Sequence, residues 1–298
     1  MSREPVRIAY VGLPLGALLL ARDGLELVWV GLSRRDSLGT RRARRVFGEC
    51  LSVTPKLDGA TLAAVRASGA NYLVSWFWTK RVPPTWLRAF AGRTLGVHPS
   101  LLPRHRGPDP IFWAIDQGDR ETGVSAHRLE EAYDVGDVLA QRTIAIDDHV
   151  DGWRLAKRLD RPSLGLLREL MGRASRGEAL AAMPQDEALA TEAPSLEEED
   201  LAIVWSWDAR RILLRIRAAA PWPGAWTEIG ERVVTIERAA ACGEVPRALR
   251  PGEAWTDGGR VFVCAGHGGV ELLRVRLEDD RVLAGPAIAS LLESSGAP

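Results

Sequence analysis

The sequence lacks the features that would indicate a disulfide-rich, metal-binding or membrane protein. It has only three cysteines, Cys50, Cys242 and Cys264, which are widely spaced and form no Cys-x-x-Cys pair. We therefore expect neither a disulfide framework nor a metal site. No apolar stretch reaches the ~20 residues that a membrane-spanning helix needs, so we expect no membrane partner and a cytoplasmic protein.

A net charge is also lacking, because 39 basic residues balance 39 acidic ones. Binding to nucleic acid would therefore depend on a local patch rather than on the overall field. One basic run follows an expected strand, and its members are Arg34, Arg35, Arg41, Arg42, Arg44 and Arg45. Such a run is typical of a phosphate-binding surface or of the solvated face of a helix, and the sequence leaves both interpretations open.

Short apolar runs alternate with helical patterns in the first half of the chain. The expected strands are 6–12, 25–32, 71–76, 94–98, 124–129 and 138–146, and the expected helices are 15–21, 60–67, 84–90, 108–117 and 152–172. This alternation predicts an α/β domain with a mostly parallel sheet. Ligands bind such sheets at the carboxyl ends of the strands.

The composition changes near residue 183, where the chain becomes acidic, polar and Pro-containing. We expect a linker over residues 183–204 between a catalytic domain, 1–182, and a C-terminal domain, 205–298. The C-terminal part has one expected helix, 208–218, followed by short alternating segments with Gly and Pro between them. This pattern predicts a small, barrel-like β domain.

Two residues stand out as candidates for chemistry. His98 comes at the end of an expected buried strand and precedes a Pro-Ser-Leu-Leu-Pro turn that would fix its backbone. Asp134 lies between two expected strands and is followed by Val135 and Gly136. A hydrogen-bonded structural histidine and an ordinary turn aspartate are the alternatives.

The motifs around these residues resemble those of the 10-formyltetrahydrofolate-dependent formyltransferases. The family pattern Asn-x-His-x-Ser-Leu-Leu-Pro is matched by GVHPSLLP at 96–103, and the later Arg-Gly is matched at 106–107. Thr-Gly-Val follows at 122–124 and Asp-x-Gly-Asp at 134–137. The segments PQDEALAT and APWPGAW and the C-terminal region resemble the methionyl-tRNA formyltransferase branch, so the resemblance covers most of the chain.

The resemblance implies a Rossmann-like catalytic domain, an OB-like C-terminal barrel, and formyl transfer from N10 of 10-formyltetrahydrofolate to a primary amine. His98 would stabilise the oxyanion as a catalytic residue, and Asp134 would hold His98 and help to move the proton. The residues expected to bind folate are Phe77, Trp78, Arg81, Val82, Tyr133, Val135 and Gly136. The residues expected to bind the acceptor substrate are Ser100, Arg106, Arg41 and Arg42.

The chain departs from the family pattern at Gly96, where the resemblance expects the asparagine that donates to the oxyanion. Asn71 is the only asparagine in the sequence and belongs to another strand. Losing one such donor typically costs about 10²–10³ in rate. The loop 75–84 is also crowded with aromatic and basic side chains, which would either stack on a pterin ring, fill its pocket or simply pack.

The acceptor favoured by the resemblance is a methionyl-tRNA. The alternatives are another small amine or an amino sugar, a descendant that binds folate without efficient transfer, and a formyl hydrolase in which water replaces the amine. The sequence gives no indication of the oligomeric state.

Overall fold

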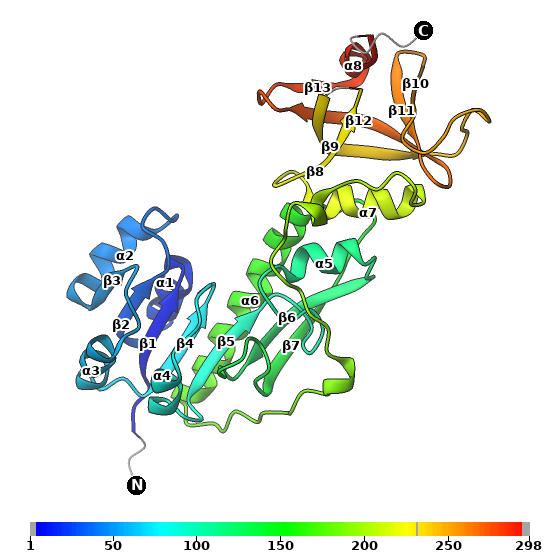
Figure 1. Cartoon of the computed structure of the whole chain (residues 1–298). Helices are drawn as coiled ribbons and strands as arrows, with labels where there is room; N and C mark the ends of the chain where they lie inside the picture. Colours follow the sequence, from blue (N-terminus) through cyan, green and yellow to red (C-terminus); the bar gives the residue numbers. More distant parts are fainter. Residues whose placement is uncertain (1–3, 231, 294–298) are drawn as a thin grey trace. The chain divides into compact units, whose positions relative to one another are not determined.

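The computed structural model describes residues 4–230 and 232–293, and the chain forms two compact units (Figure 1). Unit 1 consists of Met1–Pro108, Thr122–Ile144 and Arg158–Pro194, and unit 2 consists of Asp109–Glu121, Ala145–Lys157 and Ser195–Pro298. The domain boundaries expected from the sequence, at residues 182 and 205, concern independently folding domains and stay a prediction. Within the described ranges, no helix is both long and apolar enough to cross a membrane.

Unit 1 is built on a seven-stranded sheet with the order β3-β2-β1-β4-β5-β6-β7. Its strands are β1 (Arg7–Gly12), β2 (Glu26–Leu32), β3 (Leu51–Val53), β4 (Tyr72–Trp76), β5 (Thr94–His98), β6 (Glu121–His127) and β7 (Val138–Ala145). The pairs from β3 to β5 are parallel, and β6 is antiparallel to β5. The predicted α/β class with a mostly parallel sheet is confirmed.

Helices cover both faces of this sheet, which explains why its central strands are apolar throughout. On one face, Val65 of α3 (Gly59–Ala67) and Trp86 of α4 (Pro84–Ala89) belong to a buried cluster with Val11 and Leu73. On the other face, Gly16 of α1 (Pro14–Arg22) lies against Tyr10.

The basic run 34–45 leads into a short helix, α2 (Thr40–Phe47). Its Ala43 and Phe47 are buried, while Arg41 and Arg42 are exposed. The helix therefore presents its arginines to solvent, as the solvated-face interpretation expects, and this exposure also leaves them accessible to a ligand.

The end of β1 meets the end of β4 at the point where the strand order reverses. A Cβ at Gly12 would lie 1.8 Å from the Trp76 carbonyl oxygen, and Gly12 has a φ of +145°, so only glycine fits there. Leu13 N–H donates to the same Trp76 oxygen at 3.1 Å. This reversal point is where ligands bind in open α/β sheets, and the loop that begins at Phe77 starts from it.

Unit 2 combines helices with an antiparallel sheet. Its strands are β8 (Ala225–Ile229), β9 (Arg232–Cys242), β10 (Ala254–Asp257), β11 (Arg260–Cys264), β12 (Gly269–Leu277) and β13 (Val282–Ala284), in the order β10-β11-β12-β9-β8 with β13 paired to β12. The helix α7 (Ala209–Ala219) is capped by Asp208, whose side chain accepts from the Arg211 N–H at 2.8 Å. The predicted β-rich C-terminal part is therefore an antiparallel sheet.

Buried ion pairs fasten α7 to α5 (Pro110–Asp116) within unit 2. Arg215 Nε and Arg211 Nη2 each lie 2.7 Å from a carboxylate oxygen of Asp116, which is 1% exposed. Arg215 also lies over the ring of Trp207, with its guanidinium carbon 5.1 Å from the ring centroid. One buried carboxylate thus pairs with two arginines, of which Arg215 is buried and Arg211 is partly exposed.

The remaining helices are the long α6 (Gly152–Ser175) and the short α8 (Ser290–Glu293), with 3-10 turns at Gly48–Cys50, Glu187–Leu189, Glu199–Leu201 and Gly285–Ala289. The acidic stretch expected to be a linker begins with ordered hydrogen bonds inside unit 1. Val138 and Met183 exchange both backbone bonds, at 2.8 and 2.9 Å, and the Arg106 N–H donates to Thr191 at 2.8 Å. The stretch therefore pairs with the start of β7 at Met183 and with the loop after β5 at Thr191.

Candidate active site

His98 is the last residue of β5, and it is 7% exposed. The neighbouring β6 pairs Gly96 with His127 and His98 with Ser125. Because side chains alternate along strands and directly paired residues share a face, all of these residues project from one face of the sheet. The two imidazole rings therefore lie side by side on that face.

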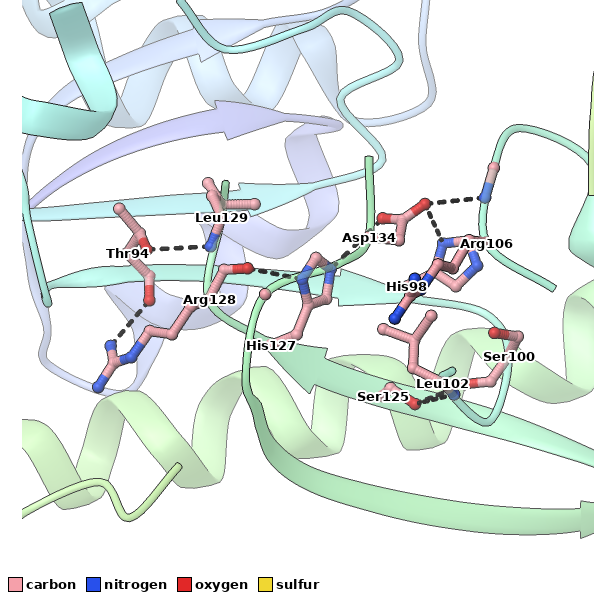
Figure 2. Close-up of polar contacts among 12 residues, drawn as sticks. Thr94, His98, Ser100, Leu102, Arg106, Ser125, His127, Arg128, Leu129 and Asp134 are labelled. Carbon is pink, nitrogen blue, oxygen red and sulfur yellow. Dashed lines mark hydrogen bonds and ion pairs between the residues drawn. The ribbon is translucent and has the colours of Figure 1, made fainter. Parts of the chain in front are cut away.

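Asp134 approaches this face from the loop between β6 and β7, with a left-handed φ of +58°. Its Oδ2 lies 3.4 Å from His98 Nδ1 and accepts from the Gly107 N–H at 3.0 Å. Its Oδ1 lies 3.5 Å from His127 Nε2. Figure 2 shows the carboxylate between the two rings. The structure thus brings the predicted pair His98 and Asp134 together and adds His127 to it.

The conformation of the Asp134 loop is held by Gln185. Its Nε2 donates to the carbonyl oxygens of Asp134 and Gly136, both at 2.7 Å. Its Oε1 accepts from Arg106 Nη2 at 2.8 Å, and Arg106 in turn pairs with Glu187. Since a non-glycine residue with positive φ is strained, these bonds supply the restraint that keeps Asp134 in place.

The turn after His98 is held equally firmly. Ser125 Oγ donates to the Ser100 carbonyl at 2.7 Å and accepts from the Leu102 N–H at 3.0 Å (Figure 2). Ser100 Oγ donates to the Arg104 carbonyl at 2.7 Å. The end of the turn contacts the His98 ring, because His98 Nε2 donates to the His105 carbonyl at 2.8 Å. Both His98 nitrogens therefore have partners.

These contacts determine where protons reside. A carbonyl oxygen only accepts, so His98 Nε2 carries a proton, and so does His127 Nδ1, which donates to the Arg128 carbonyl at 2.8 Å. In a neutral ring the nitrogen facing Asp134 is then bare. Burial lowers the pKa of His127 below its ordinary value, and the nearby His98 acts in the same direction, while Asp134 opposes them. Burial therefore favours the neutral form of the His127 ring.

The residues expected to bind folate lie in two loops of unit 1. Phe77 has a φ of +55°, is 39% exposed and contacts Trp76 edge to face at 4.9 Å. The Arg81 guanidinium lies 5.1 Å from the centroid of the Tyr133 ring, which joins the loop after β4 to the Asp134 loop. Val135 and Gly136 continue that second loop, where a Cβ at Gly136 would lie 2.0 Å from the Arg128 carbonyl oxygen.

Trp78 and Val82 pack on the core beneath the first loop. Among the described residues, the buried indole N–H of Trp78 has no hydrogen-bond partner. A flat, partly aromatic ligand fits an environment of exposed rings such as those of Phe77 and Tyr133.

The four residues expected to bind the acceptor substrate come from two elements, the loop after β5 and the helix α2. Ser100 is fully buried, Arg106 is 5% exposed, and both use their polar groups inside the protein. Arg41 and Arg42 lie exposed on α2. The expected substrate contacts of these four residues stay a prediction. No group of three or more His, Cys, Asp or Glu side chains in residues 4–230 and 232–293 is placed to hold a metal ion.

Sequence reasoning missed two members of the site. Gln185 lies in the acidic stretch expected to be a linker, although the segment PQDEALAT was one of those that carried the resemblance. His127 was not given a role from the sequence. The feature that could have indicated it is its place in β6, two residues after Ser125 and opposite Gly96.

Comparison with known proteins shows the family to which the chain is similar. Residues 45–169 match the formyl transferase family, and residues 195–291 match the formyl transferase C-terminal domain. The methionyl-tRNA formyltransferase of Anaeromyxobacter dehalogenans strain 2CP-1 is 37% identical over 290 residues, which cover 92% of this chain and 93% of the relative. That of Anaeromyxobacter sp. strain K is 40% identical over 294 residues, with the same coverage of both chains.

Two solved structures share the fold. The N-formyltransferase from Helicobacter canadensis, in complex with folinic acid and dTDP-3-aminofucose, matches with a TM-score of 0.69 at 12% identity over 90% of this chain and 98% of its own. HypX from Aquifex aeolicus, in complex with tetrahydrofolic acid, matches with a TM-score of 0.66 at 21% identity over 97% of this chain. This chain covers 47% of HypX. With both domain matches in order and close relatives along nearly its whole length, the chain belongs to the formyltransferase family.

Proposed function

We propose that this formyltransferase takes its formyl group from 10-formyltetrahydrofolate and transfers it to the primary amine of a methionyl-tRNA. The observation that carries the proposal is the contact between His98 and the Asp134 carboxylate at the carboxyl end of β5, with Oδ2 3.4 Å from Nδ1. A buried imidazole beside a carboxylate is suited to both charge stabilisation and proton transfer. The similarity to methionyl-tRNA formyltransferases supports the choice of acceptor.

The reaction requires a proton to move from the attacking amine to the leaving nitrogen and a negative charge to be stabilised on the former formyl oxygen. Asp134 holds the orientation of His98 from one side, and the His105 carbonyl holds it from the other. A protonated His98 supplies positive charge in a buried setting, where electrostatic stabilisation is strongest. Asp134, whose position is fixed by Gly107 and Gln185, accepts a proton and returns it.

Folate would be held by the two loops that meet at Arg81 and Tyr133. Phe77 offers an exposed ring surface on one loop, and Trp78 and Val82 support that loop from the core. Tyr133, Val135 and Gly136 belong to the loop that carries Asp134, so binding the ligand there would place it beside the carboxylate. When bound, folate supplies the formyl group and the leaving nitrogen.

The tRNA acceptor is supported by surfaces in each unit. In unit 1, the exposed Arg41 and Arg42 are suited to phosphate contacts, whose strength depends on salt. In unit 2, Trp153 and Trp222 are 58% and 81% exposed, and Lys157 lies 4.9 Å from the centroid of the Trp153 ring. Exposed aromatic rings beside a cation are suited to stacking on single-stranded bases. Because translation takes place in the cytoplasm, the proposed acceptor places the protein there.

The test is a formyl-transfer assay on the purified chain with 10-formyltetrahydrofolate and one of three acceptors: methionyl-tRNA, a nucleotide-linked amino sugar, or none. Release of tetrahydrofolate and formation of the N-formyl product are measured together. We expect both with methionyl-tRNA. An N-formyl product formed only with the amino sugar would mean that the acceptor is an amino sugar and not methionyl-tRNA. Release of tetrahydrofolate without any acceptor would identify a hydrolase. Binding of 10-formyltetrahydrofolate without release of tetrahydrofolate would show a non-catalytic folate-binding protein.

A further inference from the structure

The Asp134 carboxylate has a second imidazole on the side away from His98. His127 is 4% exposed, and its Nε2 lies 3.5 Å from Asp134 Oδ1, about the same separation as that between Oδ2 and His98. Its other ring nitrogen donates to the Arg128 carbonyl at 2.8 Å, as His98 does to its own carbonyl partner. The two histidines therefore contact opposite oxygens of one carboxylate (Figure 2), His98 through Nδ1 and His127 through Nε2, and each donates to a carbonyl from its other ring nitrogen.

Gly96 lies against this second ring and against Leu129. A Cβ at position 96 would lie 3.2 Å from His127 Nε2, 3.4 Å from its Cε1 and 2.5 Å from Leu129 Cδ2. A contact of 2.5 Å is one that real Cβ atoms do not make, so any side chain at 96 displaces Leu129 and presses on the imidazole. The glycine thus leaves space mainly for the Leu129 side chain and, to a lesser degree, for the His127 ring.

We propose that His127 is a positioning residue for the transfer reaction. In this proposal His98, Asp134 and His127 form a row of three groups, and the row shares one proton. This inference rests on the function proposed above. Transfer forms a bond from the amine nitrogen to the formyl carbon, breaks the bond from that carbon to the folate nitrogen, and moves one proton from the first nitrogen to the second. The row takes up that proton and gives it back, so it ends with the proton count with which it began.

The groups around His127 support this sharing. The titratable groups that act on it are Asp134 in the β6–β7 loop and His98 on β5, which have opposite effects. The adjacent Arg128 side chain donates to the Thr94 carbonyl at 2.9 Å, and Thr94 Oγ1 accepts from Leu129 N–H. Burial favours the neutral His127 ring and the Asp134 charge favours the protonated one, so His127 Nε2 takes up a proton when one reaches the carboxylate during transfer.

The first experiment does not depend on activity. Nitrogen-15 NMR of the histidine rings in the full chain, followed against pH, reports which nitrogen is protonated and the titration midpoint. We expect neutral His127 to carry its proton on Nδ1. Its midpoint should fall in Asp134→Asn, which removes the opposing charge, and rise in His98→Gln. The exposed His149, in unit 2, is the internal control.

A neutral His127 protonated on Nε2, or a midpoint unmoved by whichever of the two variants folds, would overturn the proposal. The second experiment is kinetic. In His127→Gln we expect kcat to fall about 10- to 100-fold, within or below the usual range for proton-transfer groups, with KM for the donor unchanged. The acid side of the kcat–pH profile should change shape, because one of two interacting imidazoles is gone.

His149→Gln, the same exchange at an exposed site, should change neither kinetic quantity. A His127→Gln enzyme with wild-type kcat and an identical pH profile would contradict the proposal. If the wild-type chain transfers no formyl group to any acceptor, the proposed function fails, and the NMR titration still decides whether the three groups share a proton.

Discussion

Gly96 and His127 face each other across the antiparallel pair β5 and β6, and a Cβ at position 96 would lie 3.2 Å from His127 Nε2 and 2.5 Å from Leu129 Cδ2. The resemblance to formyltransferases places an asparagine at position 96, so the glycine at first indicates a lost donor. The geometry gives the position a second meaning. The volume beside the carboxylate is occupied by an imidazole that contacts Asp134 from the neighbouring strand.

Restoring the asparagine alone should therefore harm the protein. In Gly96→Asn the new side chain meets Leu129 and His127, and overpacking of this kind typically costs about 1–3 kcal/mol. We expect urea unfolding to show a loss of that order, and transfer not to rise above wild type. In Gly96→Asn combined with Leu129→Ala, which removes the closest contact, part of the stability should return. A single variant as stable as wild type and faster in transfer would contradict this packing.

The Gln185 side chain should matter for catalysis although it lies outside the motifs. Gln185→Met keeps the size of the side chain but removes both bonds to the Asp134 loop. We expect kcat to fall about 10-fold or more, since small misplacements of reacting groups are costly, with a small change in melting temperature. Gln117→Met, at an exposed position, is the matched control. Equal kinetics in the two variants would show that Gln185 does not position Asp134.

The buried His127 should make folding sensitive to acid. Its pKa is lowered in the folded state from an ordinary value of 6.5, chiefly by burial, so below pH 6.5 the unfolded chain binds the extra proton more readily. The contribution of this group to the free energy of unfolding thus declines as the pH falls through 6.5 toward the folded pKa, and it is constant above.

Unfolding free energies measured by urea titration at several pH values should show this decline. We expect it to be shallower in His127→Gln, because the variant has no group to titrate there. Identical pH dependence in the two proteins would mean that His127 titrates equally in the folded and unfolded states.

The pair of arginines on Asp116 gives a prediction for unit 2. Asp116→Asn keeps the shape but leaves the 6%-exposed Arg215 without its charged partner. Breaking a buried pair in this way typically costs about 3–5 kcal/mol. Asp257→Asn, at an exposed position, should cost much less. Comparable urea midpoints for the two variants would show that the Asp116 network contributes little.

Much of unit 1 could be predicted because its strands are continuous apolar runs bounded by polar residues. Thr94–His98 forms β5 as expected, and the candidate site lies at its end. The edge strand β3 was missed because three residues are too few for an alternating pattern.

The site itself could be predicted only in part. His98 was found from its position at a strand end, whereas its partner Asp134 needed the resemblance, since nothing local brings the two together. The place of His127 in the site follows from the register between β5 and β6, and the residue pattern of one strand does not reveal that register. Gln185 was hidden by its composition, because an acidic, Pro-containing segment is typical of a linker although this one is hydrogen-bonded to the Asp134 loop.

The central claim is that the Asp134 carboxylate works with His98 in formyl transfer to an amine. Asp134→Asn tests it most directly, because it keeps the shape and an oxygen for the Gly107 N–H but removes the charge shared by the histidines. Single-turnover assays with 10-formyltetrahydrofolate and methionyl-tRNA should show the rate falling by about 10²–10⁴, the contribution of a group that moves protons, with donor binding retained. An Asp134→Asn enzyme that transfers formyl at the wild-type rate would contradict the account.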